Sequence, residues 1–279
     1  MTERLEARPD ATRVASGERW SYRGRWALVT GASAGIGAVF ARELAARGMH
    51  MALAARREDR LRELAAELEA AHGVLTAVLP ADLGKPGAAG VLWEEASDGR
   101  TIHLLVNNAG FGLKGRFDEL PLDRQAEMVR VNCVAPLELA HLAVREMRAR
   151  RGGGIVNVAS VAGYQPIPML ATYAATKAFL ITLSEAVAEE VREDGVRVVV
   201  VNPGPVITEF QSVAGTQVTA KTPGVKTSEE VVAAALRALE AGKSTVTPGL
   251  FNRLSSYAVR VSPRGLVVKT AKQVMTKLR

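Results

Sequence analysis

The feature that most constrains this chain is an alternation of short apolar runs with longer amphipathic segments between residues 26 and 201. Apolar residues in each run occupy consecutive positions, which is typical of strands buried on both faces. The runs are Trp26–Thr30, His50–Ala55, Val74–Leu79, Ile102–Asn107, Ile155–Ser160 and Val196–Val201. The segments between them have helical periodicity, as in residues 58–73, where Leu61, Leu64 and Leu68 share one face. The chain therefore alternates predicted strands with predicted helices.

Strands that alternate with helices pair in parallel, because each helix carries the chain back to the start of the next strand. We expect an α/β fold in which a Rossmann-like, doubly wound parallel sheet is flanked by helices on both faces. With 279 residues, 48% of them hydrophobic, the chain can bury one such core, and we place this single domain at residues 25–250. Ligands of these folds bind at the carboxyl ends of the strands, so the residues that follow each run are the candidates for a site.

The first run leads into the segment TGASAGIG, residues 30–37. Gly31, Gly35 and Gly37 let the backbone turn sharply and approach a pyrophosphate, while the helix that starts there points its free N–H groups at the anion. A glycine turn without a ligand is the alternative. Its place between a predicted strand and a predicted helix favours the phosphate-binding interpretation.

The second run leads into AARRED, with Ala55 where a fold that prefers NAD usually places an acidic residue on the ribose 2′-hydroxyl. Arg56 and Arg57 follow it. A guanidinium binds phosphate in a bidentate fork, so these arginines favour NADP(H) over NAD(H), with Arg56 as the expected contact. The alternative is that both are solvated or pair with Glu58 and Asp59.

The later runs also end in polar segments. Asp82 could accept a hydrogen bond from the adenine amino group, or it could be a turn residue in DLGKPG. The fourth run continues into NNAG, residues 107–110, whose Asn side chains could tie neighbouring strand ends together while its glycine leaves room for a cofactor. The fifth run ends at Ser160, and the sixth leads into NPGPVITEF, residues 202–210.

In the segment TYAATK, Tyr173 and Lys177 lie four residues apart. On a helix this spacing puts two side chains on one face with Cβ atoms about 6 Å apart. The pair alone is compatible with half of a catalytic site or with an ordinary aromatic residue and cation.

Taken in order, these segments resemble the short-chain dehydrogenase/reductase family, and in particular its single-domain members, over residues 25–210. The resemblance depends on TGASAGIG, DL at 82–83, NNAG, Asn132 in VNCVAP, Ser160 in VASVAG, YAATK, and NPGPVIT. It implies reversible hydride transfer between a nicotinamide cofactor and an alcohol or carbonyl carbon. The catalytic tetrad of the family corresponds to Asn132, Ser160, Tyr173 and Lys177.

The implied roles agree with the chemistry of carbonyl reduction, which needs a proton donor and a hydrogen-bond donor at the oxygen. Tyr173 would supply the proton, and Ser160 would hold and polarise the carbonyl. The ammonium of Lys177 would lower the pKa of Tyr173 from its usual value of about 10 and would bind the nicotinamide ribose. Asn132 resembles the residue that holds a water next to the lysine.

The glycine loop, the strand ends and the resemblance together give one set of expected cofactor contacts. These are Gly31, Ser33, Ala34, Gly35, Ile36, Gly37, Arg56, Asp82, Leu83, Asn107, Ala109, Gly110, Tyr173, Lys177, Pro203, Gly204, Val206 and Thr208. Ordinary loop packing is the alternative for Val206 and Thr208.

Two largely apolar segments, residues 111–115 and 163–171, are expected to line the substrate pocket. They favour an uncharged, apolar small-molecule carbonyl compound or alcohol, although the same residues could simply pack the loops.

Residues 205–227, rich in Gly, Thr and Pro, are expected to form a lid. By resemblance, helices at about 123–149 and 175–193 would form a homodimer or homotetramer.

Charge is distributed unevenly along the chain. Residues 243–279 hold eight of the 36 Lys and Arg and none of the 29 Asp and Glu, whereas the rest is nearly neutral. No basic stripe with interleaved aromatics runs through the domain, so we expect no nucleic-acid partner.

The tail, residues 251–279, is expected to be helical, with Val267, Ala271, Val274, Met275 and Leu278 on one face. Such a segment can lie on an anionic membrane, but we favour packing on the protein itself or on a neighbouring subunit.

The remaining expectations are negative or general. Residues 1–24 are polar and aperiodic, and we expect a mobile extension there without a secretory signal. Cys133 is the single cysteine and is expected to be a small buried hydrophobic residue, which agrees with a reducing cytoplasmic location. The four histidines are far apart, so no metal is expected. The alternative function is a sensor or scaffold that binds NADP(H) without turnover and docks through its basic tail.

Overall fold

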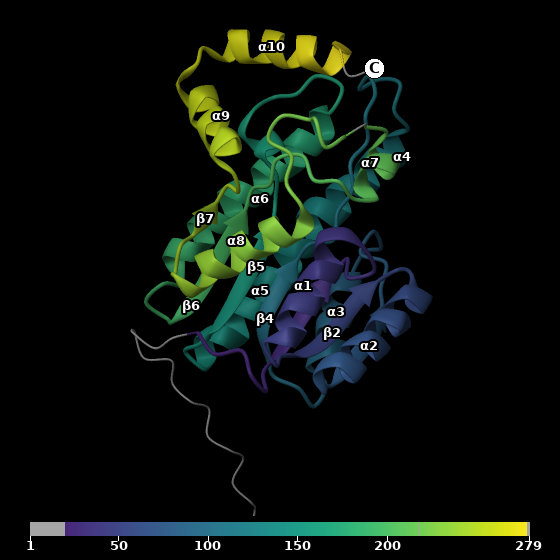
Figure 1. The fold of residues 1–279 in the computed structure, drawn as a ribbon, viewed down its shortest axis with the longest axis vertical. Helices are drawn as coiled ribbons and strands as arrows, with labels where there is room; N and C mark the ends of the chain where they lie inside the picture. Colours follow the sequence, from purple (N-terminus) through teal and green to yellow (C-terminus); the bar gives the residue numbers. More distant parts are fainter. Residues whose placement is uncertain (1–19, 217, 278–279) are drawn as a thin grey trace, which may run out of the picture.

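The computed structural model describes residues 20–216 and 218–277, and the residues expected to form a mobile extension lie outside this part except for 20–24. Parallel strands form one sheet in the order β3-β2-β1-β4-β5-β6-β7 (Figure 1). The strands are β1 (Trp26–Thr30), β2 (His50–Ala55), β3 (Thr76–Pro80), β4 (Ile102–Asn107), β5 (Gly153–Val158), β6 (Val196–Val201) and β7 (Thr245–Val246).

Helices connect the strands and continue beyond them. They are α1 (Gly35–Ala46), α2 (Glu58–His72), α3 (Ala88–Ser97), α4 (Leu122–Val129), the π-helical η1 (Arg130–Val134), α5 (Ala135–Ala149), the 3₁₀-helical η2 (Val161–Tyr164), α6 (Ala171–Glu190), α7 (Phe210–Ala214), α8 (Ser228–Glu240), α9 (Leu250–Val261) and α10 (Arg264–Lys277).

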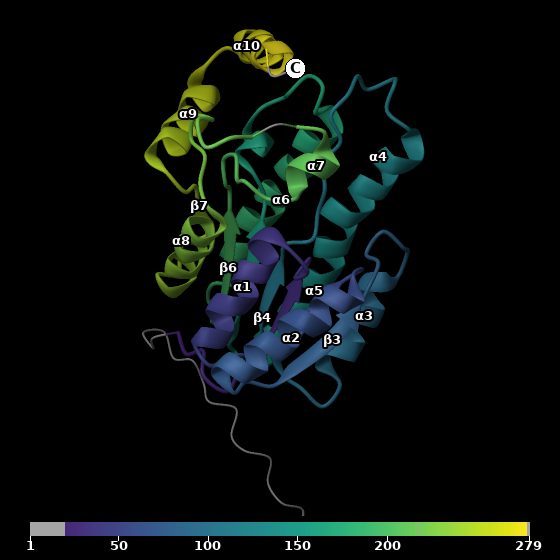
Figure 2. The ribbon, with the colours of Figure 1, turned by 45° about the vertical axis from the view of Figure 1, so that its right-hand side comes forward.

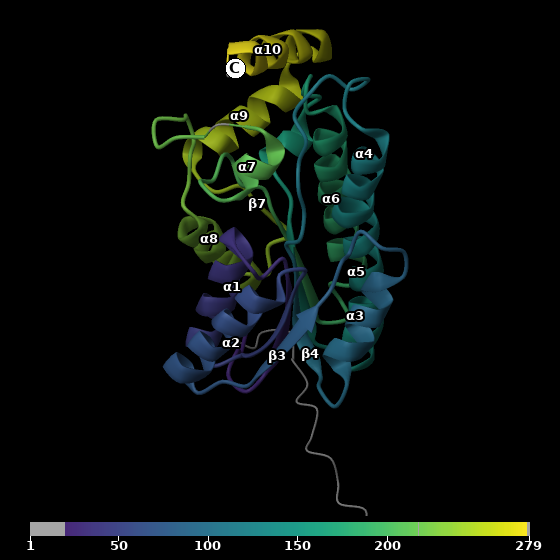
Figure 3. The same ribbon diagram turned by 90° about the vertical axis from the view of Figure 1, so that its right-hand side faces the viewer.

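The sheet is covered on both faces. Figures 2 and 3 show α1, α2 and α8 on one side of the sheet and α3, α5 and α6 on the other. The order of strands reverses between β1 and β4, which is the switch point at which these folds bind ligands. The doubly wound parallel sheet predicted from the sequence is confirmed.

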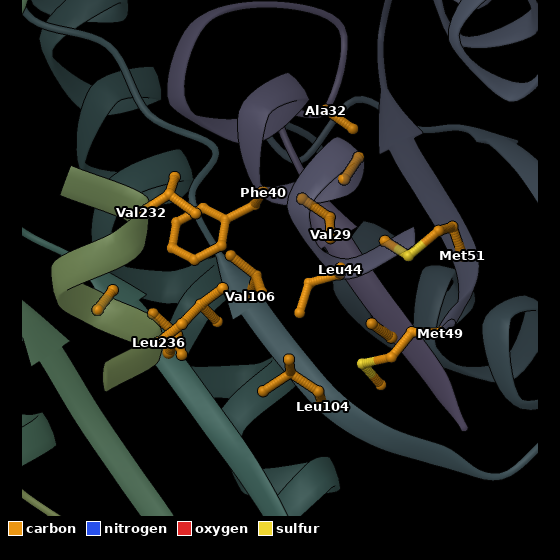
Figure 4. Packing of buried hydrophobic residues seen from close by; sticks show 14 of the residues in the cluster. Val29, Ala32, Phe40, Leu44, Met49, Met51, Leu104, Val106, Val232 and Leu236 are labelled. Atoms are coloured by element: carbon orange, nitrogen blue, oxygen red, sulfur yellow. The ribbon is translucent and has the colours of Figure 1, made fainter. Parts of the chain in front are cut away.

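The core on the α1 side fixes the position of the glycine loop. Phe40 and Leu44 of α1 pack between the sheet and Leu236 of α8, and all three side chains are fully buried (Figure 4). Burying side chains of this size contributes about 1.5–3 kcal/mol each. Since α1 is held along its length, its first turn stays at the carboxyl end of β1.

Several elements differ from the expectation. The two-residue strand β7 is too short to give a sequence pattern. The helix expected at 123–149 begins as α4, widens into a π turn at η1 and continues as α5. Trp20 and Tyr22, which the sequence places in the extension, belong to the domain: Trp20 is 9% exposed and the Tyr22 hydroxyl donates to Glu240 at 2.8 Å.

The basic tail forms α9 and α10, which lie beyond the carboxyl ends of the strands at the top of Figure 1. Val267 and Ala271 of α10 are buried. Among residues 20–216 and 218–277, no helix has the length and apolarity needed to cross a membrane.

Candidate active site

A cavity of about 580 Å³ opens at the carboxyl edge of the sheet. Its walls come from the glycine loop, from the segments that follow β2 to β6, from residues 203–222 and from Met275 of α10. Segments far apart in the sequence therefore meet at the edge where the sequence predicted a site. In the described part of the chain, no cluster of three His, Cys, Asp or Glu residues has the geometry of a metal site.

The glycine loop has the shape that a pyrophosphate needs. Gly31 and Gly35 have φ of +66° and +55°, in the left-handed region that favours glycine. A methyl group at Gly37 would lie 2.3 Å from the Gly31 carbonyl oxygen, so only glycine lets the loop fold onto α1. Ala34, the N-cap of α1, gives no side-chain cap, and the first N–H groups of the helix stay available at the cavity wall. The loop therefore fits the phosphates of a dinucleotide.

The arginines after β2 both line the cavity but point to different partners. Arg57 donates from Nε and Nη2 to the Ser33 hydroxyl at 3.2 and 3.1 Å, and from Nη1 to Glu209 at 2.8 Å. Arg56 lies 3.6 Å from the carboxylate of Glu127. Ser33, Arg56 and Arg57 thus form a basic, hydrogen-bonding corner, whose chemistry suits a phosphate.

Glu209 reaches this corner from the segment after β6. It also accepts from Arg60 at 2.6 Å, and the hydrogen bonds from Arg57 and Arg60 hold its pKa below the usual range. Residues 205–227, the segment expected to form a lid, are thereby tied to the start of α2. The sequence interpretation missed this contact, because nothing in the spacing of residues 57 and 209 indicates that they meet.

The asparagines and aspartate at the other strand ends take distinct places. The Asn107 side chain is buried away from the cavity and donates to Asn157 at 2.9 Å, which joins β4 to β5. Asn108 lines the cavity and donates to the Thr30 carbonyl at 2.9 Å, which ties the glycine loop to β4. Asp82 lines the cavity and accepts from the Gly84 N–H at 3.1 Å. Asp82 therefore forms the turn that the sequence left as one alternative, and its adenine contact stays a prediction.

Tyr173 and Ser160 meet at the cavity wall. Tyr173 lies in the first turn of α6 and is 8% exposed, with its ring 5.5 Å from that of Phe210. Ser160 is the N-cap of η2, and its hydroxyl accepts from the Ala162 N–H at 3.1 Å. Burial raises the pKa of Tyr173 to about 12, and the hydrogen bond from Ser160 opposes this shift. Two hydroxyl groups therefore face one point of the cavity, and the phenol keeps its proton.

Lys177 lies one turn after Tyr173, as the sequence predicted, and is 5% exposed. Its ammonium donates to the Val158 carbonyl at 2.9 Å and lies 5.9 Å from the centroid of the Tyr173 ring. Burial lowers the pKa of Lys177 to about 8. Burial is the largest cause of the shift in the Tyr173 pKa and the opposing contribution comes from Ser160, so a lowering by Lys177 stays a prediction.

Asn132 lies in the π turn η1 and is 1% exposed. Its amide donates to the Phe111 carbonyl at 2.9 Å and to the Thr176 hydroxyl at 3.0 Å, and it accepts from the Phe111 N–H at 3.1 Å. Beneath Gly110, Asn132 and Lys177 are neighbours: a methyl at Gly110 would lie 3.0 Å from Asn132 Oδ1 and 3.5 Å from Lys177 Nζ. The side chain fixes the start of the 111–115 segment and lies next to the lysine.

The far side of the cavity is apolar and comes from irregular segments. Apolar side chains on this wall are Phe111, Ile167, Leu170, Phe210, Val213 and Met275. Phe111, Leu113, Ile167, Leu170 and Phe210 pack against a small cluster that includes Tyr173. The sequence predicted the segments 111–115 and 163–171 here, but Phe210 and Met275 were not among the expected pocket residues.

Most of the expected cofactor contacts lie on the cavity wall. Of that set, the wall includes Gly31, Ser33, Ala34, Gly35, Ile36, Arg56, Asp82, Leu83, Ala109, Gly110, Tyr173, Lys177, Pro203, Gly204, Val206 and Thr208. Gly37 and Asn107 lie behind the wall and support it. Of the tetrad, Ser160, Tyr173 and Lys177 line the cavity, and Asn132 lies behind Gly110.

The short chain dehydrogenase family matches residues 25–219, which include the glycine loop, the tetrad and the segment after β6. The chain belongs to this family. Over 194 residues it is 39% identical to a very-long-chain 3-oxoacyl-CoA reductase of Laccaria bicolor, a match that covers 68% of this chain and 57% of that protein. It is 35% identical over 185 residues to a 7beta-hydroxysteroid dehydrogenase of Collinsella aerofaciens, with 66% and 70% covered. The chain thus matches little more than half of the Laccaria reductase.

Solved structures of the family have the same architecture. A 7beta-hydroxysteroid dehydrogenase superposes with a TM-score of 0.80 at 29% identity, covering 90% of this chain and 97% of the other. A short-chain dehydrogenase from Sphingobium yanoikuyae in complex with NADPH superposes with a TM-score of 0.78 at 32% identity, covering 87% and 94%. The chain therefore has the sequence pattern and the fold of the short-chain dehydrogenase family.

Proposed function

We propose that this protein is an NADP(H)-dependent oxidoreductase that interconverts an apolar ketone or aldehyde and the corresponding alcohol, with Tyr173 as the general acid and base. The observation that carries the proposal is that Ser160, Tyr173 and the buried Lys177 line the same cavity wall, with Lys177 Nζ 5.9 Å from the centroid of the Tyr173 ring. This arrangement offers two donors to one carbonyl oxygen.

In the reductive direction, the substrate oxygen gains negative charge and must be stabilised and protonated. The nicotinamide cofactor, when bound, supplies the hydride. The Ser160 hydroxyl polarises the carbonyl, and the Tyr173 phenol transfers its proton to the forming alkoxide oxygen. A phenol with a pKa of about 12 is fully protonated at neutral pH, so it is ready to act as the donor.

Lys177 stabilises the phenolate that remains after proton transfer, because its positive charge lies near the ring. Its pKa of about 8 also lets it exchange a proton near neutral pH. Asn132 positions the 111–115 segment and the polar surroundings of the lysine through its three hydrogen bonds. In this proposal Asn132 is a positioning residue.

The preference for NADP(H) is supported by the corner formed by Ser33, Arg56 and Arg57. A guanidinium at this corner would bind a 2′-phosphate with charge-assisted hydrogen bonds, whereas the position of Ala55 offers no carboxylate to a 2′-hydroxyl. The Sphingobium relative that was solved with NADPH is consistent with this preference.

The substrate class is supported by the apolar far wall of the cavity. Phe111, Ile167 and Leu170 offer apolar surface next to the Tyr173 hydroxyl. The names of the relatives, a very-long-chain 3-oxoacyl-CoA reductase and 7beta-hydroxysteroid dehydrogenases, agree with a reacting carbon that belongs to a large apolar group. We infer an uncharged, bulky, apolar carbonyl compound.

Self-association is proposed on the side of α5 and α6. Val134, Leu137 and Phe179 are 40%, 41% and 39% exposed on this side of the sheet. These half-exposed apolar side chains would be covered in a homodimer, and Leu137→Glu should convert the dimer to a monomer in light scattering.

The function is tested by NADPH oxidation with a panel of bulky apolar ketones and aldehydes, followed by the Tyr173→Phe variant. We expect turnover in the wild type and a loss of roughly a thousandfold or more in the variant, with nearly unchanged NADPH affinity. NADPH binding without turnover across the panel would favour the sensor alternative, and full turnover in Tyr173→Phe would exclude the mechanism.

A further inference from the structure

The outward face of α9 is apolar and its inward face is polar, which is the reverse of an ordinary surface helix. Leu250, Leu254, Tyr257 and Val261 are 61%, 58%, 60% and 86% exposed. At about 100° per residue these four positions fall within one narrow stripe along the helix, which we call the outer stripe. Figure 1 shows α9 at the upper left, with α10 crossing above it.

The polar side of α9 fixes its rotation. Asn252 is 4% exposed and donates to the carbonyls of Gly224 at 2.8 Å and Pro248 at 2.9 Å. Methyl groups at Gly204 and Gly224 would lie 2.4 and 2.2 Å from Asn252 Oδ1, so the amide fills a closely fitting slot. The helix therefore cannot turn its outer stripe inward without pulling a buried amide from its partners.

A second contact holds the other end of the helix. The Arg260 guanidinium lies 4.9 Å from the centroid of the Tyr164 ring. Together with Asn252, this contact keeps the outer stripe facing away from the domain. A contiguous exposed apolar surface of this kind marks an interaction site.

The charge of the same region indicates what covers the stripe. Arg253, Arg264 and Lys269 of α9 and α10 are exposed, and no Asp or Glu follows Glu240 in the chain. In a symmetric contact with a second copy, these cations would be brought near their own equivalents, which is unfavourable. An anionic lipid surface matches both properties, since its headgroups attract the cations and its acyl boundary accepts the apolar side chains.

We propose that α9 and α10 dock this protein on an anionic membrane surface, with the outer stripe inserted at the acyl boundary and with Arg253, Arg264 and Lys269 against lipid phosphates. The sequence alone placed the membrane-facing residues on the last helix instead. In the structure, Val267 and Ala271 of that helix are buried against the protein, and the free apolar surface belongs to α9.

Docking in this orientation places the cavity close to the lipid. Met275 of α10 forms part of the cavity wall, so the helix that would lie on the membrane also borders the site of Tyr173. A route for apolar substrates from the bilayer follows only if the proposed oxidoreductase function holds. The docking proposal itself does not require that function, and its test uses no turnover measurement.

The test is co-sedimentation of the full chain with vesicles of phosphatidylcholine alone and of phosphatidylcholine with about 30% phosphatidylglycerol. We expect binding to the anionic vesicles that falls at least tenfold between about 0.1 M and about 1 M salt. The double variant Leu254→Gln/Val261→Gln should lose about tenfold in partitioning. The matched control Leu75→Gln/Val91→Gln changes two exposed apolar residues elsewhere, 59% and 56% exposed, and should bind as the wild type does.

The charge contribution is tested separately with Arg264→Gln/Lys269→Gln. Each cation near an anionic surface strengthens binding about fivefold, so this variant should lose about twenty-fivefold. Lys85→Gln/Lys243→Gln removes two exposed lysines outside these helices and should change binding little. Circular dichroism and thermal melting of every variant check that the fold is kept.

Two results would overturn the proposal. One is equal binding, or no binding, of the wild type to neutral and anionic vesicles. The other is a change of mass in light scattering for Leu254→Gln/Val261→Gln without a change in vesicle binding, which would show that a second copy of the chain covers the outer stripe.

Discussion

The two halves of the cavity are built in different ways. The cofactor half consists of the glycine loop and the ends of β1 to β4, whose strands are buried and joined by regular parallel pairing. The substrate half consists of residues 111–115, 161–171 and 210–222 and of α10, and residues 203–208, which include expected cofactor contacts, border both halves. There Met169 has a φ of +70°, α7 has only five residues, and one isolated bridge joins Val206 to Lys226. The sheet thus supports the reaction, while loops and the terminal helix determine what fits beside it.

Lys177→Met should have the largest effect, and it should change turnover and stability in opposite directions. Turnover should fall roughly a thousandfold, because the phenolate of Tyr173 loses its neighbouring charge. Stability should rise by up to about 3 kcal/mol at pH 7, because a buried ammonium with a pKa lowered to about 8 is penalised.

The size of this gain depends on pH. The folded protein binds fewer protons than the unfolded chain between the folded pKa of about 8 and the unfolded value, so wild-type stability rises with pH across that window. The gain of Lys177→Met is therefore largest below pH 8 and shrinks towards pH 10. Urea titrations at both pH values measure it, with the exposed Lys85→Met as the control. A loss of stability at pH 7 would contradict the assigned burial penalty.

Gly37→Ala should damage the cofactor half without touching the substrate half. The added methyl would lie 2.3 Å from the Gly31 carbonyl oxygen, so the loop must move. We expect NADPH binding to weaken about a hundredfold, which corresponds to about 2.8 kcal/mol, in a fluorescence titration. Gly90→Ala is the matched control, because a methyl at Gly90 of α3 would meet open space. Equal affinities of the two variants would show that the loop is less constrained than its contacts indicate.

Arg56→Ala and Arg57→Ala test the edge of the cofactor half. Each variant should lose about ten- to thirtyfold in NADPH affinity and little in NADH affinity, because only NADPH carries the 2′-phosphate. Arg62→Ala, an exposed change in α2, the helix that follows these arginines, serves as the control. Titrations with both cofactors decide the question, and parallel losses for NADPH and NADH would remove the basis for the NADP(H) preference.

The pH profile tests how the two ionisable groups cooperate. Reductive turnover needs a protonated phenol and a protonated amine, and the pKa values are about 12 for Tyr173 and about 8 for Lys177. Turnover should be flat below pH 8 and should fall about tenfold per unit above it. Steady-state rates with one ketone across pH 6–10 give the profile. A profile that stays flat to pH 10 would mean that the charge of Lys177 is not required.

Met275→Ala should have the smallest effect, and it should affect the substrate half alone. Loss of one apolar side chain from the wall should raise the KM of a bulky ketone about three- to tenfold and leave the KM of NADPH unchanged. The neighbouring Val274→Ala, which changes a side chain that is 50% exposed, is the control. An effect on the NADPH KM would indicate that α10 also supports the cofactor half.

The difference between the halves also explains what the sequence could predict. The six runs with consecutive apolar residues are confirmed as strands to within a few residues, because burial on both faces gives a pattern that does not depend on distant parts of the chain. The glycine loop, Ser160, Tyr173 and Lys177 lie just after such strands or on the helix that follows, so local motifs placed them correctly at the cavity.

The contacts that the sequence did not predict join segments that are distant in the chain. Glu209 meets Arg57 across the cavity mouth, and Met275 reaches the wall from the last helix. No local sequence pattern predicts these contacts, because they depend on how loops and terminal helices pack after the sheet has formed. The burial that raises the pKa of Tyr173 was also not predicted, since the degree of burial follows from packing and not from a spacing of four residues.

The π turn at η1 limits the insertions and deletions that this part of the chain can tolerate. A π turn holds one residue more than the same stretch of α-helix, and each residue rotates a helix by about 100°. Deleting a single residue between Arg130 and Val134 would let the ladder close as a regular α-helix, so α4 and α5 would keep their relation but the side chains within the turn would change direction. Asn132 would then swing away from Phe111 and Thr176. Exposed positions nearby should accept many substitutions, but the number of residues in this turn should not vary.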